Sequence, residues 1–249
     1  MLVRFQPVSP NIIMKDLIGV FDSGIGGLST LEALKKELPN ENFFYFGDKK
    51  NNPYGEKPQS DLEAIVSGIC SFLVKKKSAK MIVVACNTAT TKCISFLRDK
   101  FPEVKFIGTE PAVKLACDSE AKNILVLATP GTINSERMGA LVEKNRKIGQ
   151  EITLLPCAGL ADVIEKNDPR DIEKKLDEIF DNVETEKFDA VVLGCTHYVL
   201  VKNLIANYFK NAKILDGNEK TAKHAKKVLQ ENNLLSEKSK VGTIEYFYT

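Results

Sequence analysis

The sequence lacks the features that mark several large classes of protein. No apolar run approaches the ~18 residues that a membrane-spanning helix needs, and residues 1–13 have no continuous apolar core of the kind found in a secretory signal. The formal net charge is only +2, which gives no argument for a nucleic-acid partner. We therefore expect a cytoplasmic protein that binds neither membranes nor nucleic acids.

Histidines and closely spaced cysteines are also scarce. The chain has two histidines, His197 and His224, and Cys195 with His197 alone is too small a ligand set for zinc, so no metal site is expected. The six cysteines form no C-x-x-C pair. In a chain of 249 residues without an export signal, they are expected to be reduced, free thiols.

Short β-rich runs alternate with helical periodicities along the chain, and several of these runs are continuously apolar, as parallel strands covered on both faces are. The alternation predicts an α/β fold with doubly wound parallel sheets. Residues 1–13 are expected to be a loose extension, with the fold beginning near Lys15. The expected strands are 17–21, 42–46, 81–85, 104–108, 124–128, 152–155, 190–193, 213–215 and an edge strand at 243–248. The expected helices are 28–38, 60–76 with Ser60 as N-cap, 90–101, 111–117, 135–147, 160–166, 168–182, 200–209 and 219–231.

A weak internal repeat singles out two cysteines. Segments 83–88 and 192–197 each contain an apolar strand, a cysteine and two polar residues, and a helix follows each. Ligands of open α/β sheets collect at the carboxyl ends of strands, which favours a chemical role for Cys86 and Cys195, although cysteine is also often buried for packing alone. A helix N-terminus beside Cys86 is expected to lower the pKa of its thiol. His197 is expected to shift or shuttle the proton of Cys195.

Two thiols in matched settings suit inversion of a stereocentre by proton transfer. This reaction needs a base on one face of the carbon and an acid on the other, and the two groups exchange roles when the direction reverses. Cysteine is suitable because its pKa lies near neutrality and is easily tuned. The competing use is a redox pair, but redox pairs are usually close in sequence, and Cys86 and Cys195 are 109 residues apart.

Two loops are candidates for binding a ligand. The loop Asp22–Gly27 follows a strand and opens a helix, whose free N–H groups can hold an anion. Ser29 replaces the last glycine of the dinucleotide fingerprint and no P-loop lysine is present, so a small carboxylate fits better than a nucleotide. A structural turn is the alternative. The polar loop Asp48–Gly55 is either a surface loop or a pocket wall in which Tyr54 and backbone N–H groups meet a carboxylate.

Together these motifs resemble the aspartate/glutamate racemase family, and its glutamate racemases in particular. Four segments match in order between Leu17 and about Val228: residues 19–27 (GVFDSGIGG), 53–55 (PYG), 85–89 (ACNTA) and 193–197 (LGCTH). The resemblance implies two similar doubly wound α/β domains with the active site in the cleft between them. We expect the first to span residues 1–109 plus 216–249 and the second residues 110–215.

The resemblance also implies an isomerase that interconverts L- and D-glutamate without metal or pyridoxal phosphate, as a homodimer. D-Glutamate would supply peptidoglycan, and so cell-wall biogenesis and cell shape. Cys86 would exchange the α-proton of the D-enantiomer with help from Asp22, and Cys195 that of the L-enantiomer with help from His197, itself supported by Glu165. The residues that would hold the substrate are Asp22, Ser23, Tyr54, Gly55, Asn87, Thr88, Thr196 and His197.

The sequence departs from the family in one loop, and two other functions stay open. The family's Gly-Asp-Thr/Ser-Ala-Arg stretch before Pro-Tyr-Gly reads GDKKNN at residues 47–52, so the arginine is missing. One alternative is an aspartate racemase or another isomerase or decarboxylase of the same superfamily; cysteines at both strand ends disfavour a single-cysteine decarboxylase. The other is a non-catalytic binding module for acidic amino acids.

Overall fold

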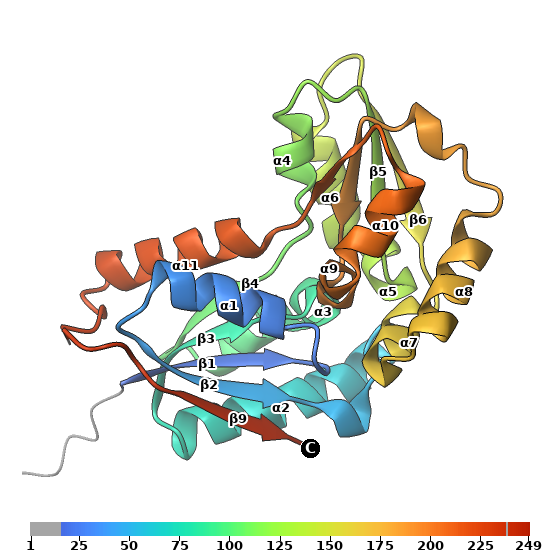
Figure 1. Ribbon diagram of the computed structural model, residues 1–249. Coiled ribbons are helices and arrows are strands. Elements are labelled where there is room, and N and C mark those ends of the chain that lie inside the picture. The colour runs from blue at the N-terminus through green and yellow to red at the C-terminus, as the bar shows by residue number, and fades with distance from the viewer. Residues whose placement is uncertain (1–15, 238) are drawn as a thin grey trace, which may run out of the picture.

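The computed structural model describes residues 16–237 and 239–249, which contain two parallel β-sheets (Figure 1). The expected loose extension at residues 1–13 lies outside the described residues. All strand pairs in both sheets are parallel. The first sheet has the order β4 (Lys105–Gly108), β3 (Ala79–Val84), β1 (Leu17–Asp22), β2 (Asn42–Gly47) and β9 (Ile244–Tyr248). The second sheet has the order β6 (Glu151–Pro156), β5 (Asn123–Ala128), β7 (Ala190–Leu193) and β8 (Lys213–Leu215).

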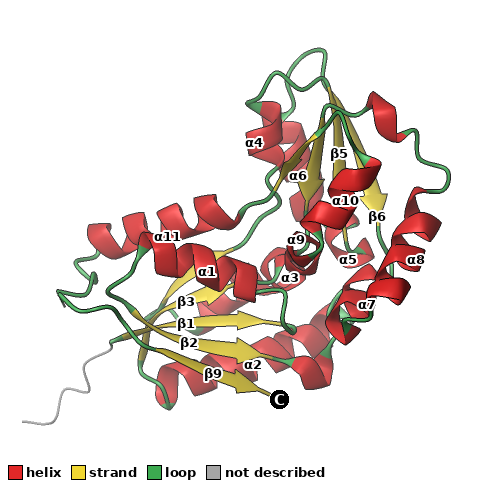
Figure 2. Cartoon of the chain, in the orientation of Figure 1, coloured by secondary structure: helices red, strands yellow, loops and turns green. Residues whose placement is uncertain are grey.

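Helices cover both faces of each sheet (Figure 2), which explains why the central strands are apolar throughout. On the first sheet, α1 (Leu28–Glu37) and α11 (Asn218–Glu231) pack on one face, and α2 (Gln59–Lys75) and α3 (Asn87–Lys100) on the other. One face of the second sheet carries α7 (Leu160–Lys166), α8 (Pro169–Phe180), α9 (Thr196–Leu200) and α10 (Lys202–Tyr208). The other carries α4 (Val113–Cys117), α5 (Pro130–Ile133) and α6 (Glu136–Asn145). The predicted α/β class with parallel sheets is confirmed.

The chain crosses between the sheets twice. It leaves the first sheet after β4, builds the whole second sheet, and returns through α11 and β9. The expected edge strand is confirmed, since β9 pairs with β2 at the border of the first sheet. In the described part of the chain, no helix has the length and apolar character required to cross a membrane.

Several predicted helix boundaries were wrong, and the largest errors lie beside the two cysteines. Helix α3 begins at Asn87 and not at residue 90. The predicted helix 200–209 corresponds to α10, and the short helix α9 that precedes it was not predicted. Polar residues such as Asn87 and Thr196 have low helix propensity, and the sequence therefore predicted loops where the two helices begin. Ser60 is not the N-cap of α2, because the helix starts after Pro58. The short helix α5 was not predicted.

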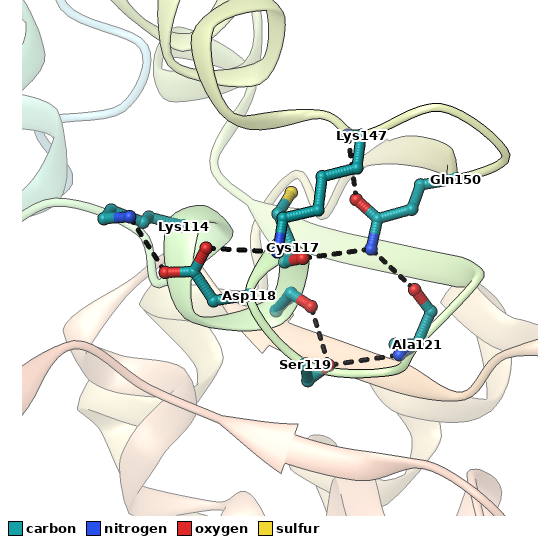
Figure 3. Close-up of polar contacts among 8 residues, drawn as sticks. Lys114, Cys117, Asp118, Ser119, Ala121, Lys147 and Gln150 are labelled. Atoms are coloured by element: carbon teal, nitrogen blue, oxygen red, sulfur yellow. Dashed lines mark hydrogen bonds and ion pairs between the residues drawn. The ribbon is translucent and has the colours of Figure 1, made fainter.

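A polar cluster at the start of the second sheet has a structural role (Figure 3). The side-chain amide of Gln150 donates a hydrogen bond of 3.2 Å to the carbonyl of Cys117. Asp118, next along the chain, lies 2.8 Å from Lys114 Nζ and 3.4 Å from Lys147 Nζ. These contacts join the end of α4 to the turn that precedes β6, so the cluster stabilises the beginning of this sheet.

Candidate active site

A cavity of about 200 Å³ lies where the carboxyl ends of the strands of both sheets meet. Its walls come from the loops after β1, β2 and β3 of the first sheet and after β5, β6 and β7 of the second. This is the position at which open α/β sheets bind ligands. The residues that line it are Ser23, Asn52, Pro53, Tyr54, Gly55, Glu56, Cys86, Asn87, Thr88, Thr129, Pro130, Cys157, Gly159, Ala161, Asp162, Cys195, Thr196 and His197.

The two cysteines singled out from the sequence line this cavity from different sheets. Cys86 follows β3 and is the N-cap of α3, and Cys195 follows β7 and is the N-cap of α9. Both have extended backbones, with φ near −126° and −140°, and both are buried, with 5% and 7% of their surface exposed. The predicted placement of each thiol at a strand end that opens a helix is confirmed.

The pKa of the Cys86 thiol differs from expectation in its net direction. Burial raises it well above the usual value, and the charge of Asp22 raises it further. The Ala89 N–H at the start of α3 and the Ser23 hydroxyl act in the opposite direction. The prediction of a lowered pKa was therefore wrong, because the contribution of the helix N-terminus is smaller than the cost of burying a thiolate. Cys86 is a neutral thiol at neutral pH.

Asp22 does not line the cavity but joins the two halves of the site from behind. Its Oδ2 accepts a hydrogen bond of 3.0 Å from the Gly24 N–H, and its Oδ1 accepts one of 3.1 Å from the Thr196 hydroxyl on the opposite sheet. Burial raises the pKa of this carboxyl, and the charge of His197 and these hydrogen bonds only partly offset that effect. Asp22 is thus a fully buried carboxyl poised to hold a proton more readily than an exposed aspartate.

His197 and Glu165 form a buried pair beside Cys195. His197 Nε2 lies 2.8 Å from Glu165 Oε2, and the same oxygen accepts a 2.8 Å hydrogen bond from the Ile25 N–H of the first sheet's glycine loop. Burial lowers the pKa of His197, but the hydrogen bonds with Cys195 and Glu165 and the charge of Asp22 outweigh it and raise the value to about 10. An imidazolium therefore stands next to Cys195 at neutral pH.

The pKa of Glu165 is lowered, which favours an ion pair between its carboxylate and the His197 imidazolium. Burial raises it, but the hydrogen bonds from His197 and from the Ile25 N–H outweigh that effect and leave it below the usual value. The sequence matched Glu165 only weakly, and the structure brings it into direct contact with the histidine. The carboxylate of Glu165 and the imidazolium of His197 thus stabilise each other.

Tyr54 lines the cavity, but its hydroxyl is already engaged. It donates a hydrogen bond of 2.6 Å to Oδ2 of the buried Asp48. Burial and this hydrogen bond raise the pKa of Tyr54, which keeps the phenol neutral. Residues 53–55 therefore form a wall of the cavity that is fixed by Asp48, while a contact between this wall and a ligand stays a prediction.

The comparisons with known proteins agree on one family. The sequence model of the protein family described as Asp/Glu/Hydantoin racemase matches residues 18–225 of this chain. The chain belongs to this family. It is 39% identical over 234 residues to a glutamate racemase of Clostridium perfringens, an alignment that covers 92% of this chain and 89% of the relative. Family membership makes the protein an isomerase.

Solved structures of racemases have the same fold. Glutamate racemase RacE1 of Bacillus anthracis is similar with a TM-score of 0.81 and 29% identity, over 94% of this chain and 88% of that one. The Francisella tularensis glutamate racemase, solved in complex with D-glutamate, gives a TM-score of 0.80 at 29% identity and the same coverage. The two-sheet architecture of this racemase is therefore shared with its structural neighbours.

Several residues that line the cavity of this racemase were missed in the sequence. Cys157 follows β6 directly, so the pattern of strand and then cysteine occurs a third time and was a usable signal. Thr129 is the N-cap of α5, with Pro130 at the first helical position, a recognisable helix start. The Thr129 hydroxyl lies 3.0 Å from that of Thr88 on the other sheet. Hydroxyl contacts thus join the two walls of the cavity.

We expect Gly24→Ala to lower racemase activity about tenfold, because a misplaced catalytic neighbour is costly even when the fold survives. A Cβ on Gly24 would overlap Glu165 Oε2, the oxygen that holds both His197 and the Ile25 N–H. The carboxylate would have to move, and the histidine beside Cys195 would lose its partner. Steady-state kinetics with thermal unfolding in parallel would measure the effect.

Gly68→Ala is the matched control for this substitution. Gly68 is exposed in the middle of α2, and an added Cβ would meet nothing within 4 Å. Activity should be unchanged, and the helix should gain about 0.5–1 kcal/mol from the replacement of glycine. Wild-type kinetics in Gly24→Ala would show that the Glu165 contact does not matter for turnover.

Proposed function

We propose that this protein interconverts L-glutamate and D-glutamate through two opposed cysteines, without metal or pyridoxal phosphate. One observation carries the proposal: Cys86 and Cys195 come from the strand ends of two different sheets and line one small cavity. An acid and a base on opposite faces of one carbon are what racemisation by proton transfer requires. The glutamate racemases among the relatives support glutamate as the substrate.

The reaction takes the α-proton from one face and returns a proton to the other. With L-glutamate, the thiolate of Cys195 accepts the α-proton, and the thiol of Cys86 donates its proton to the opposite face of the resulting carbanion. With D-glutamate the two thiols exchange these roles. The neutral Cys86 supports its role as acid in the first direction, and the His197 imidazolium supports a thiolate on Cys195. Asp22 assists Cys86 when that thiol must lose its proton.

The remaining residues of the site hold the substrate and stabilise its transient negative charge. Asn87 and Thr196 begin α3 and α9, where free backbone N–H groups favour a carboxylate. The substrate's polar groups would be held there and by Ser23, Thr88 and the backbone of residues 54–55. Preorganised donors in a cavity closed to water stabilise a developing carbanion without reorganisation.

The same proposal includes the division into domains, the homodimer and the role of the product in the cell. Residues 1–109 with 216–249 form one domain and residues 110–215 the other, and their approach closes the cleft over the substrate. The protein works in the cytoplasm as a homodimer and supplies D-glutamate for peptidoglycan, and thus for the cell wall and cell shape.

No cluster of three or more His, Cys, Asp or Glu side chains suited to a metal ion occurs among residues 16–237 and 239–249.

Incubation in heavy water tests the function directly. With L-glutamate, we expect the optical rotation to decay to zero while deuterium enters the α-carbon, because the inverted carbon receives its new hydrogen from a solvent-exchanged thiol. L-Aspartate is incubated in parallel. Exchange with aspartate alone would assign the alternative substrate, and binding of either amino acid without exchange would assign a binding module. No deuterium in either amino acid would refute the racemase proposal.

A further inference from the structure

The last strand of the chain ends beside the active-site loop. β9 runs parallel to β2 with Tyr248 opposite Gly47, so both strands point to the edge of the sheet that carries the cavity (Figure 1). The backbone N–H of Thr249 continues the ladder with a 3.2 Å hydrogen bond to the Gly47 carbonyl. An edge strand needs only such backbone bonds for pairing. The side chains of Tyr248, the last residue of β9, and of Thr249, which follows it, make further contacts, and both lead into the site.

The first of these contacts runs from Thr249 to the cavity wall. The Thr249 hydroxyl accepts a 2.9 Å hydrogen bond from the Lys50 N–H and donates one of 2.9 Å to Asp48 Oδ1. The other oxygen of Asp48 accepts the 2.6 Å hydrogen bond from Tyr54. Asp48 is only 1% exposed, and the side-chain amide of Asn51 in the same loop also donates to its two oxygens, at 3.0 and 2.9 Å. Two hydrogen bonds therefore separate the end of β9 from a residue that lines the cavity.

The second contact runs from Tyr248 to the histidine pair. The Lys49 ammonium lies 4.9 Å from the centre of the Tyr248 ring, a distance at which a cation is attracted to the ring face. The same ammonium lies 3.5 Å from Glu165 Oε1, which has no hydrogen-bond partner among the residues that the structure describes, while Glu165 Oε2 holds His197. The end of β9 thus supports both the wall at Tyr54 and the carboxylate behind His197.

We propose that Thr249 is a positioning residue of this active site, through which β9 fixes the loop of residues 48–55 against the cavity. The inference rests on the proposed function for its kinetic consequence but not for the loop contact itself. A threonine hydroxyl is suited to this place because it can accept from one backbone N–H and donate to a carboxylate at the same time. Loss of the hydroxyl removes two of the hydrogen bonds that hold the loop and leaves the backbone ladder between β2 and β9 intact.

Three substitutions at the two ends of β9 test the proposal. Thr249→Val removes the hydroxyl with both of its hydrogen bonds and keeps the branched shape. Because Thr249 acts on the substrate only through the loop, we expect KM for L-glutamate to rise about three- to tenfold, with a smaller change in kcat. Thr249→Ser should restore the wild-type KM. Thr243→Val is the matched control. The Thr243 hydroxyl donates to Asn42 at 3.1 Å, at the end of β9 opposite to the loop, so KM should not change.

Hydrogen exchange of the backbone amides supplies a readout that needs no substrate. In Thr249→Val, the amides of residues 50–52, 54 and 55 should exchange faster than in the wild type and in Thr243→Val. Unchanged exchange and unchanged KM in Thr249→Val would overturn the inference, as would the same KM rise in Thr243→Val or no recovery in Thr249→Ser. A wild type that exchanges no α-proton but shows the loop difference would refute the proposed function and still support the contact.

Discussion

Cys86→Ser and Cys195→Ser are each expected to lower the rate of glutamate racemisation about 10²- to 10⁴-fold, the range for loss of a positioned acid or base. A serine hydroxyl is close in size to the thiol, so the fold and the cavity survive. Its pKa is far higher, so it is a poor proton acceptor at neutral pH. Because each turnover needs both groups, neither single variant should retain substantial racemisation. Loss of optical rotation of L-glutamate measures the effect.

The two variants should differ in which enantiomer of glutamate still exchanges its α-proton. In Cys86→Ser, Cys195 can still remove the α-proton of L-glutamate and return a solvent deuteron to the same face, so deuterium should enter L-glutamate without loss of rotation. In Cys195→Ser, the same is expected of D-glutamate. Cys93→Ser, a buried cysteine on α3 that does not line the cavity, serves as control and should racemise normally. Full activity in either cavity variant would remove the two-base mechanism.

The fold was predictable wherever one local pattern dominated. Continuously apolar runs identified the central strands, and α7 matched its prediction residue for residue because periodicity alone defines it. Where polar residues open a helix, as at Asn87 and Thr196, intrinsic propensity predicted a loop and tertiary packing prevailed. The strand-to-helix position of both thiols survived this error, because it depended on the strands.

The contacts that complete the site were beyond local patterns. Glu165 meets the Ile25 N–H across 140 residues of sequence, and Thr196 meets Asp22 across 174. Nothing in either segment encodes such a pairing, which arises only when two sheets face each other. The direction of the Cys86 pKa was lost for the same reason: burial by distant segments outweighs the neighbouring helix N-terminus. Family resemblance supplied both Glu165 and its pairing with His197, and the structure added the Ile25 N–H as a second partner.

His197→Asn should lower kcat/KM for glutamate about 10²- to 10⁴-fold, because the charged group beside Cys195 is lost. Asparagine keeps an amide that can reach Glu165, so the pair loses its charge more than its shape. Since L- and D-glutamate are equally stable, kcat/KM must fall by the same factor in both directions. Deuterium exchange in each enantiomer then locates the defect, and we expect it at the L-enantiomer, which faces Cys195. Equal loss for the two enantiomers would contradict the assignment of His197 to Cys195.

The same substitution should change how stability depends on pH. The pKa of His197 rises from its usual 6.5 to about 10 in the folded protein, so its contribution is fully present below about pH 6.5 and is lost as the pH rises through about 10. Between pH 7 and 8 the folded protein keeps a proton that most unfolded chains have lost, and the histidine alone should lower the free energy of unfolding by roughly 1 kcal/mol. Urea unfolding at both pH values measures this fall. Because buried thiols with raised pKa values add to the fall, it should be smaller in His197→Asn by the share of the histidine, and equal falls in both proteins would show that His197 is not held as an imidazolium.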